Sequence, residues 1–300
     1  SYSYDPQAEE LTARNILRQS IELIARFPSI VAYAYQAKRH YFHNESLYIH
    51  APEKELSTAA NFLQMIRPDR VYTPLEAEVL DLALVLHAEH GGGNNSAFTI
   101  HVVSSAATDT YSAVAAAVGS LKGAKHGGAN YRVMSMIADI KANVSDWADE
   151  EEVQSYIEKI LRKEAHDRSG LVYGMGHAVY TVSDPRAVLL KEKAGELAGE
   201  KGYDAEFGLY QAIEKVTPAA FRAVKGFERV IAPNVDFFSG FVYSMLNIPS
   251  DLYTPIFAMS RIAGWCAHRL EEFISGGRII RPAYKSVMPR TDYVRLPERS

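Results

Sequence analysis

The segment Thr73-Pro74-Leu75-Glu76 predicts the start of a helix and indicates how the rest of the chain folds. Thr73 can accept a capping hydrogen bond, Pro74 suits the first helical position, and Glu76 completes a capping box. Apolar residues then recur at helical spacing as Leu75, Val79, Leu82 and Leu86. The segment therefore predicts an amphipathic helix, and the same kind of pattern recurs along most of the chain.

Helical periodicity continues on both sides of this segment. Before it, the pattern predicts helices over 8–27, 30–39 and 57–66, with Pro28 separating the first two. After it, caps and apolar spacing predict helices over 111–121, 130–143, 150–168, 185–199, 206–216, 218–224, 236–246 and 254–273. Alternation typical of strands is limited to 278–284 and 292–296. We therefore expect an all-α fold.

Composition excludes several classes of function. The chain has 300 residues, 47% hydrophobic and 23% charged, as in an ordinary globular protein. A net charge of -4 gives no attraction to nucleic acid, and no apolar run is long enough to span a membrane. Cys266 is the only cysteine, so no internal disulfide can form. The chain begins with Ser1 and shows no targeting segment, so we expect a processed or cut cytoplasmic protein.

Four short polar segments stand out from the helical pattern. Each places a titratable side chain beside residues that turn the chain or begin a helix, and three of them contain a histidine. They are His87-Ala88-Glu89-His90-Gly91-Gly92-Gly93-Asn94-Asn95-Ser96, Gly123-Ala124-Lys125-His126-Gly127-Gly128-Ala129-Asn130, Gly174-Met175-Gly176-His177 with Asp184-Pro185-Arg186, and Pro233-Asn234-Val235-Asp236. One such segment alone is typical of an ordinary turn or cap, so their order and spacing carry the interpretation.

In order and spacing, the four segments resemble citrate synthase, and the resemblance extends from about residue 5 to residues 281–282. It implies a citrate synthase-like fold of two helical domains with the active site in the cleft between them. Residues 1–126 and 247–300 would form the large domain, and residues 127–246 the small one. The family's usual N-terminal segment would precede Ser1, so we expect the large domain to be incomplete.

The resemblance implies a condensation of acetyl-CoA with oxaloacetate, which needs a base, an enolate stabiliser and an acid. Asp236 matches the base, and burial would raise its pKa and strengthen it as a base. His126 matches the neutral donor to the enolate oxygen, and His177 matches the acid that protonates the ketone. Each has a structural alternative: Asp236 as a helix N-cap, and the two histidines as residues of glycine-rich turns.

Arginine suits a dicarboxylate because its guanidinium can donate two parallel hydrogen bonds. Arg261 lies on an otherwise apolar helix, where its charge requires a ligand or a buried partner. The resemblance implies that oxaloacetate is bound by His90, His177, Arg186, Arg261 and, from the neighbouring subunit of a homodimer, Arg281. A surface ion pair is the alternative for each arginine. The coenzyme A site would be lined by Tyr173, Gly174, Met175 and Gly176.

The sequence leaves two other functions open. A 2-methylcitrate synthase would use the same residues with propionyl-CoA, and the walls of the acyl pocket would decide the preference. Alternatively, the chain is an inactive fragment, or one piece of a nicked enzyme that acts with a separate N-terminal chain. No metal or other cofactor is expected, because His87 and His90 do not have the spacing of the zinc-protease motif.

Overall fold

The computed structural model describes residues 2–123, 126–176, 180, 182–226 and 230–299, and their secondary structure is helical. Among these residues no strand is present, and an isolated β-bridge joins Met175 to Pro233. The helices are α1 (Ala13–His43), α2 (Thr58–Ile66), α3 (Pro74–His87), α4 (Asn95–Ser105), α5 (Thr110–Leu121), α6 (Ala129–Asn143), α7 (Glu150–Leu161), α8 (Pro185–Lys201), α9 (Asp204–Lys225), α10 (Val235–Met245) and α11 (Tyr253–Ser275), with short 3-10 helices at Tyr2–Tyr4, Ser250–Leu252 and Leu296–Glu298. The all-α prediction is confirmed, and the strands predicted at 278–284 and 292–296 are wrong.

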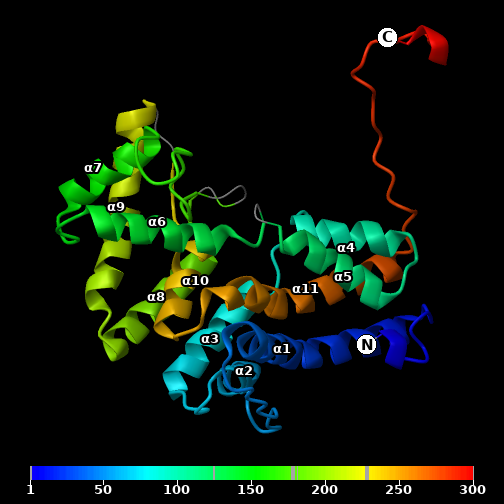
Figure 1. The fold of residues 1–300 in the computed structure, drawn as a ribbon, viewed down its shortest axis with the longest axis horizontal. Helices are drawn as coiled ribbons and strands as arrows, with labels where there is room; N and C mark the ends of the chain where they lie inside the picture. The colour runs from blue at the N-terminus through cyan, green and yellow to red at the C-terminus, as the bar shows by residue number, and fades with distance from the viewer. Residues whose placement is uncertain (1, 124–125, 177–179, 181, 227–229, 300) are drawn as a thin grey trace.

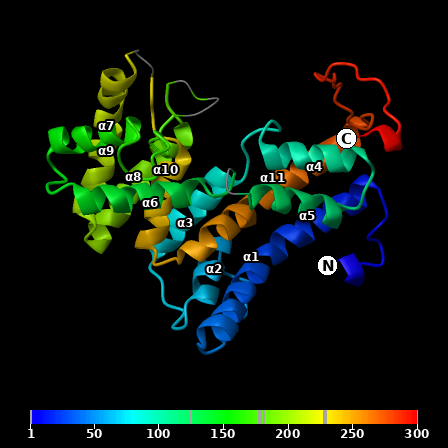
Figure 2. The same ribbon diagram turned by 45° about the horizontal axis from the view of Figure 1, so that its top comes forward.

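The helices gather into two groups (Figures 1 and 2). Helices α1, α4, α5 and α11 pack around Trp265 and Ile262, whereas α6 to α9 lie together at the other end of the molecule. A second apolar cluster runs without a break from α2 and α3 through α6 to α10. The division of the chain into domains at residues 126 and 246 therefore stays a prediction.

The capping box at the start of α3 is complete. The Glu76 backbone N–H donates to Thr73 Oγ1 at 3.2 Å, and the Thr73 N–H donates to Glu76 Oε2 at 2.8 Å. The same carboxylate forms ion pairs with Arg67 and Lys201, at 2.7 and 2.6 Å. Although burial opposes ionisation of Glu76, these two cations hold its pKa at about 2. The two ion pairs also connect the start of α3 to the ends of α2 and α8.

Two predicted helix breaks are wrong, because Pro28 lies inside α1 and Pro218 lies inside α9. A proline in a helix interior lacks one donor and costs about 3 kcal/mol. Pro28 is buried, and Thr217 beside Pro218 is buried with its hydroxyl donating to the Ile213 carbonyl at 2.6 Å. Tertiary packing of the long helices therefore outweighs the local preference for a break.

Other boundaries also differ from the prediction. Helix α1 begins after its cap Thr12 rather than at residue 8, and α7 ends at Leu161 rather than at residue 168. Helix α4 has no counterpart among the predicted helices because glycines precede it and hydroxyl residues obscure its periodicity. Asn94 caps it by accepting a hydrogen bond from the Ser96 N–H at 3.2 Å.

Beyond α11 the chain leaves the helical body as an extended tail (Figure 1). Tyr284, Val287 and Tyr293 in this tail are exposed at 94%, 95% and 81%, so nothing within the described chain covers them. Within the part of the chain that the structure describes, no helix has both the length and the apolar character needed to cross a membrane.

Candidate active site

Two segments of the predicted site are joined directly by backbone hydrogen bonds. The Gly176 N–H donates to the Ala232 carbonyl at 2.7 Å, and the Asn234 N–H donates to the Gly174 carbonyl at 2.8 Å. Gly174 has a φ of +79°, and a Cβ there would lie 2.9 Å from Phe237, so this close approach requires glycine. His177 itself lies outside the described residues, but its neighbour Gly176 is thereby held against the segment that leads to Asp236.

Asp236 lies in the first turn of α10 and is not its N-cap, so the structural alternative for this residue is wrong. The cap is Asn234, whose Oδ1 accepts from the Asp236 N–H at 3.0 Å. Within the described residues no group donates a hydrogen bond to the Asp236 carboxylate. Burial of this carboxylate raises its pKa to about 6, although the charges of Arg186 and Arg261 oppose the rise. A carboxylate of this kind is suited to remove a proton near neutral pH.

His126 lies in the turn just before α6 and contacts the start of α4. Its Nε2 lies 3.1 Å from both Asn94 Oδ1 and Ser96 Oγ. Ser96 is itself fixed, because Trp265 Nε1 donates to its hydroxyl oxygen at 3.0 Å. Burial, and next the charge of Arg261, lower the pKa of His126, so the ring is neutral at physiological pH.

Arg186 and Asp184 connect the starts of two helices. Arg186 Nε and Nη2 donate to the two oxygens of Asp184 at 3.0 and 2.8 Å. The Val235 N–H at the start of α10 donates to the same carboxylate at 3.2 Å. Asp184 therefore positions Arg186 and helps to hold the helix that carries Asp236. Asp184 also caps α8, because its Oδ1 accepts a hydrogen bond from the Arg186 N–H at 3.0 Å.

Arg261 on α11 is 1% exposed. The sequence predicted that its charge would need a ligand or a buried partner. Its Nε donates to the His87 carbonyl at 2.7 Å, and its guanidinium lies 4.7 Å from the centre of the Phe257 ring. Burial lowers its pKa to about 10. Among the described residues its Nη1 has no hydrogen-bond partner. A buried N–H group without a partner is costly, so this atom is suited to an anionic ligand.

His87 lies beside Arg261 and was not predicted as a site residue. It is fully buried, and within the described chain neither ring nitrogen has a hydrogen-bond partner. Burial, followed by the charges of Arg261 and Arg186, lowers its pKa to about 3, so it stays neutral. Its position three residues before His90, in the same polar segment, was the signal that could have identified it.

The remaining predicted residues divide into those near this cluster and those outside it. His90 and Arg186 both face Tyr180, at 5.7 Å between ring centres and 5.6 Å from guanidinium to ring. Tyr173 donates from its hydroxyl to Asp167 Oδ2 at 2.6 Å, beside the turn formed by residues 174–176. Arg281 lies exposed in the C-terminal tail, so the single chain does not bring it to the site and its role stays a prediction.

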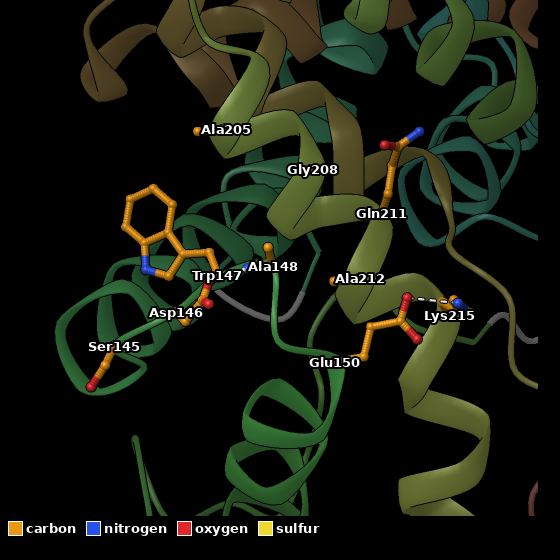
Figure 3. A pocket seen from close by; sticks show the side chains of 10 residues that line it. All are labelled: Ser145, Asp146, Trp147, Ala148, Glu150, Ala205, Gly208, Gln211, Ala212 and Lys215. Atoms are coloured by element: carbon orange, nitrogen blue, oxygen red, sulfur yellow. Dashed lines mark hydrogen bonds and ion pairs between the residues drawn. The ribbon is translucent and has the colours of Figure 1, made fainter.

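A surface cavity of about 550 Å³ lies apart from these residues, between the α6–α7 connection and α9 (Figure 3). Trp147 stands on one side of it, and a 2.6 Å ion pair between Glu150 and Lys215 closes the other. None of the predicted site residues lines this cavity. The candidate site therefore rests on the buried polar groups around Asp236 and Arg261 and not on the size of a pocket.

Comparison of the sequence and the fold with known proteins identifies the family of this chain. Residues 1–283 match the family model described as citrate synthase, C-terminal domain. The chain is 42% identical over 287 residues to citrate synthase of Haloferax volcanii, which covers 93% of this chain and 67% of that protein. It is 37% identical over 270 residues to 2-methylcitrate synthase of Shewanella oneidensis, covering 89% of this chain and 64% of that protein.

A solved structure agrees with the sequence relatives. The ternary complex of citrate synthase from Thermoplasma acidophilum with carboxymethyl coenzyme A and oxaloacetate matches at a TM-score of 0.76 and 30% identity, covering 96% of this chain and 71% of that one. The chain thus spans about two thirds of the length of these relatives. On the family match, the identities and the shared helical fold, this chain belongs to the citrate synthase family of condensing acyltransferases.

Proposed function

We propose that this chain condenses acetyl-CoA with oxaloacetate to give citrate and coenzyme A. The observation that carries the proposal is that a carboxylate with a pKa of about 6, Asp236, and a neutral histidine, His126, both lie within electrostatic reach of the buried Arg261. Base, neutral donor and buried cation are what an enolate condensation onto a dicarboxylate needs. The solved relative whose complex contains oxaloacetate and a coenzyme A analogue supports the choice of substrates.

In the proposed reaction, Asp236 takes a proton from the methyl group of acetyl-CoA, and the C–H electron pair forms the enolate. The enolate carbon attacks the ketone carbon of oxaloacetate, and the ketone oxygen takes a proton from His177. Water then cleaves the thioester of citryl-CoA and releases coenzyme A. Proton transfer, formation of the C–C bond and hydrolysis of the thioester use only side chains and water, so the proposed reaction needs no cofactor. Acetyl-CoA is a substrate.

The neighbours of His126 suit the role of enolate stabiliser. The Ser96 hydroxyl donates to Asn94 Oδ1 at 2.9 Å, and in the proposed mechanism it turns to donate to His126 Nε2, 3.1 Å away, so that the neutral ring carries its proton on Nδ1. That tautomer presents Nδ1–H as a donor to the thioester oxygen as charge develops there. The unpartnered Arg261 Nη1, with Arg186 and His90, would take the carboxylates of oxaloacetate. The backbone at residues 173–176 remains the proposed coenzyme A site.

Release of free thiol from acetyl-CoA and from propionyl-CoA, each with and without oxaloacetate, tests the proposed reaction. We expect release that depends on oxaloacetate, and faster release from acetyl-CoA. Faster release from propionyl-CoA would assign the chain as a 2-methylcitrate synthase, an activity that a 37% identical relative has by name. Release from neither substrate would contradict both proposals and favour an inactive fragment or a piece that needs a separate N-terminal chain.

The acid side of the pH profile should report Asp236. The base acts only when it has lost its proton, so kcat/KM should fall as the pH drops below about 6, the pKa to which burial raises this carboxyl. Rates with subsaturating acetyl-CoA, measured from about pH 4 to pH 8, provide the check. A profile that stays flat down to the ordinary aspartate range near pH 4 would contradict a desolvated base at this position.

We also propose a homodimer in which the tail of one subunit brings Arg281 to the oxaloacetate site of the other. The exposed aromatic and aliphatic residues of the tail support this, because they need a surface to cover them. The cytoplasmic location and the participation of a separate N-terminal chain remain predictions from the sequence.

A further inference from the structure

A second pair of histidines lies outside the proposed active site, where α4 packs against α11. His101 Nε2 lies 3.1 Å from His268 Nδ1, and the two ring centres are 4.8 Å apart. Glu271 on the next part of α11 places its Oε2 3.2 Å from His268 Nδ1. One oxygen and two nitrogens therefore face one another, although His101 and His268 lie 167 positions apart in the sequence.

The separation of these atoms fits a transition-metal ion. In a tetrahedral zinc site with bonds of about 2.0–2.1 Å, neighbouring ligand atoms lie about 3.3 Å apart. The two short separations at His268 Nδ1 are 3.1 and 3.2 Å, and all three ligand atoms lie within 4.8 Å of one another. Small side-chain rotations would bring them onto one ion.

Each histidine has a carboxylate at its opposite ring nitrogen. His101 Nδ1 lies 2.8 Å from Glu272 Oε2, and His268 Nε2 lies 3.0 Å from Glu89 Oε2. The hydrogen bond to Glu272 fixes the His101 ring and directs its other nitrogen towards an ion, as in carboxylate–histidine–zinc arrangements, whereas Glu89 faces His268 Nε2 as an ion-pair partner without a hydrogen bond. Among the described residues no lysine or arginine forms an ion pair with Glu89, Glu271 or Glu272. Glu89 interacts electrostatically with Arg261, so Glu271 and Glu272 carry the negative charge that a cation would balance.

An ion can reach this cluster from solvent. The side chains of His101 and His268 are 17% and 13% exposed, whereas that of Glu271 is 68% exposed and opens the cluster to water. The backbone of Gly92 passes over the histidine pair, because a Cβ at that position would lie 3.4 Å from His101 Nε2. A water molecule could complete the coordination on the open side.

We propose that His101 Nε2, His268 Nδ1 and a Glu271 carboxylate oxygen bind a divalent transition-metal ion, with Zn²⁺ the best match to this donor set. Glu272 and Glu89 orient the two histidines from outside the coordination shell. Binding requires a free lone pair on His101 Nε2 and His268 Nδ1, so each neutral ring would carry its proton on the opposite nitrogen, which a carboxylate faces.

The proposed ion would also act on the active-site segment. Glu89 lies between His87 and His90, and a Cβ on Gly264 of α11 would meet Glu89 and Ala88, so this segment packs tightly on the helix. A bound ion that fixes His268 would therefore fix Glu89 and the segment that carries His90. This goes beyond the proposed condensation and does not depend on it.

Zinc binding to the full chain, freed of metal with a chelator, tests the site by isothermal titration. The wild type should bind one Zn²⁺ per chain at this site, and His101→Gln should lose that binding. Glu272→Gln, which removes an outer carboxylate, should weaken it by about 10- to 100-fold. His50→Gln, a histidine remote from the cluster, should leave it unchanged and is the matched control.

Co²⁺ provides a second readout that a merely structural histidine pair would not change. The wild type should show the visible absorption of a four-coordinate Co²⁺ ion, and His101→Gln should not. If His101→Gln loses its helical circular dichroism, Glu271→Gln replaces it, because that side chain is exposed and its loss should not affect folding. Equal zinc affinity in the wild type and in either ligand variant would overturn the proposal. Because binding is measured, this result is independent of whether citrate forms.

Discussion

Asp236→Asn is expected to reduce turnover with acetyl-CoA and oxaloacetate by about 10³- to 10⁴-fold, because the amide cannot accept the methyl proton. The substitution keeps the shape of the side chain, and the cap of α10 belongs to Asn234 and is unaffected. Oxaloacetate contacts Arg261 and Arg186 in the proposed site, so its affinity should be largely retained. Thiol-release rates and an oxaloacetate titration of the same variant measure the two effects separately.

Asp204→Asn is the matched control, since Asp204 also lies in the first turn of a helix, α9, but is exposed. It should leave turnover unchanged. Near-normal turnover of Asp236→Asn, or an equal loss in Asp204→Asn, would show that Asp236 is not the base. Loss of both turnover and oxaloacetate binding in Asp236→Asn would instead indicate a structural role.

The stability of Asp236→Asn separates these roles further. Burial raises the folded-state pKa of Asp236 from 3.8 to about 6, so the folded protein favours the protonated carboxyl. The stability contributed by that proton is present below about pH 4 and is lost as the pH rises through 6, a change of about 3 kcal/mol. Asparagine does not titrate, so the variant should gain stability relative to the wild type between these pH values. Urea unfolding at about pH 4 and pH 7 measures this difference, and a constant difference would contradict a raised pKa.

The helical fold could be predicted from sequence because its signals are local. The capping box at Thr73 and Glu76 is present as predicted, and the helices predicted from residues 111 and 185 follow the caps Asp109 and Asp184, since each cap requires only residues within one helical turn. The continuity of α1 through Pro28 could not be predicted, because it depends on packing against residues distant in the sequence. Helix α4 was not predicted because its buried face is small and carries hydroxyls, so its apolar periodicity is weak.

The same contrast between local signals and long-range contacts applies to the site residues. Asp236, His126 and Arg261 could be named from their segments, and the structure brings Asp236 and His126 each within electrostatic reach of Arg261. The positioning roles of Asp184 and Ser96 depend on contacts across 51 and 30 residues, which no spacing indicates. The histidine pair of His101 and His268 was invisible for that reason, because its two members lie on different helices.

His126→Ala is expected to reduce turnover by about 10²- to 10³-fold, the loss typical of removing one donor to a developing oxyanion. Burial lowers the pKa of His126, which favours its neutral form, so we expect Asp236 and not His126 to set the acid side of the pH profile. The variant should therefore be slower by a similar factor at every pH, with the fall below about pH 6 retained from Asp236. Thiol-release rates across the pH range provide the measurement, and disappearance of that fall would show that His126 is the titrating group.

The double variant His126→Ala with Asp236→Asn tests whether the two residues serve one step. If both act on enolate formation, the double variant should be little slower than Asp236→Asn alone, because an enolate that is not formed cannot be stabilised. If the fold-losses in turnover of the two single variants multiply in the double variant, the two side chains contribute independently, to different steps. The same double-variant test applies to Ser96, whose Oγ lies 3.1 Å from His126 Nε2. A residue that only positions the ring should slow turnover when His126 is present and have no further effect once His126 is alanine.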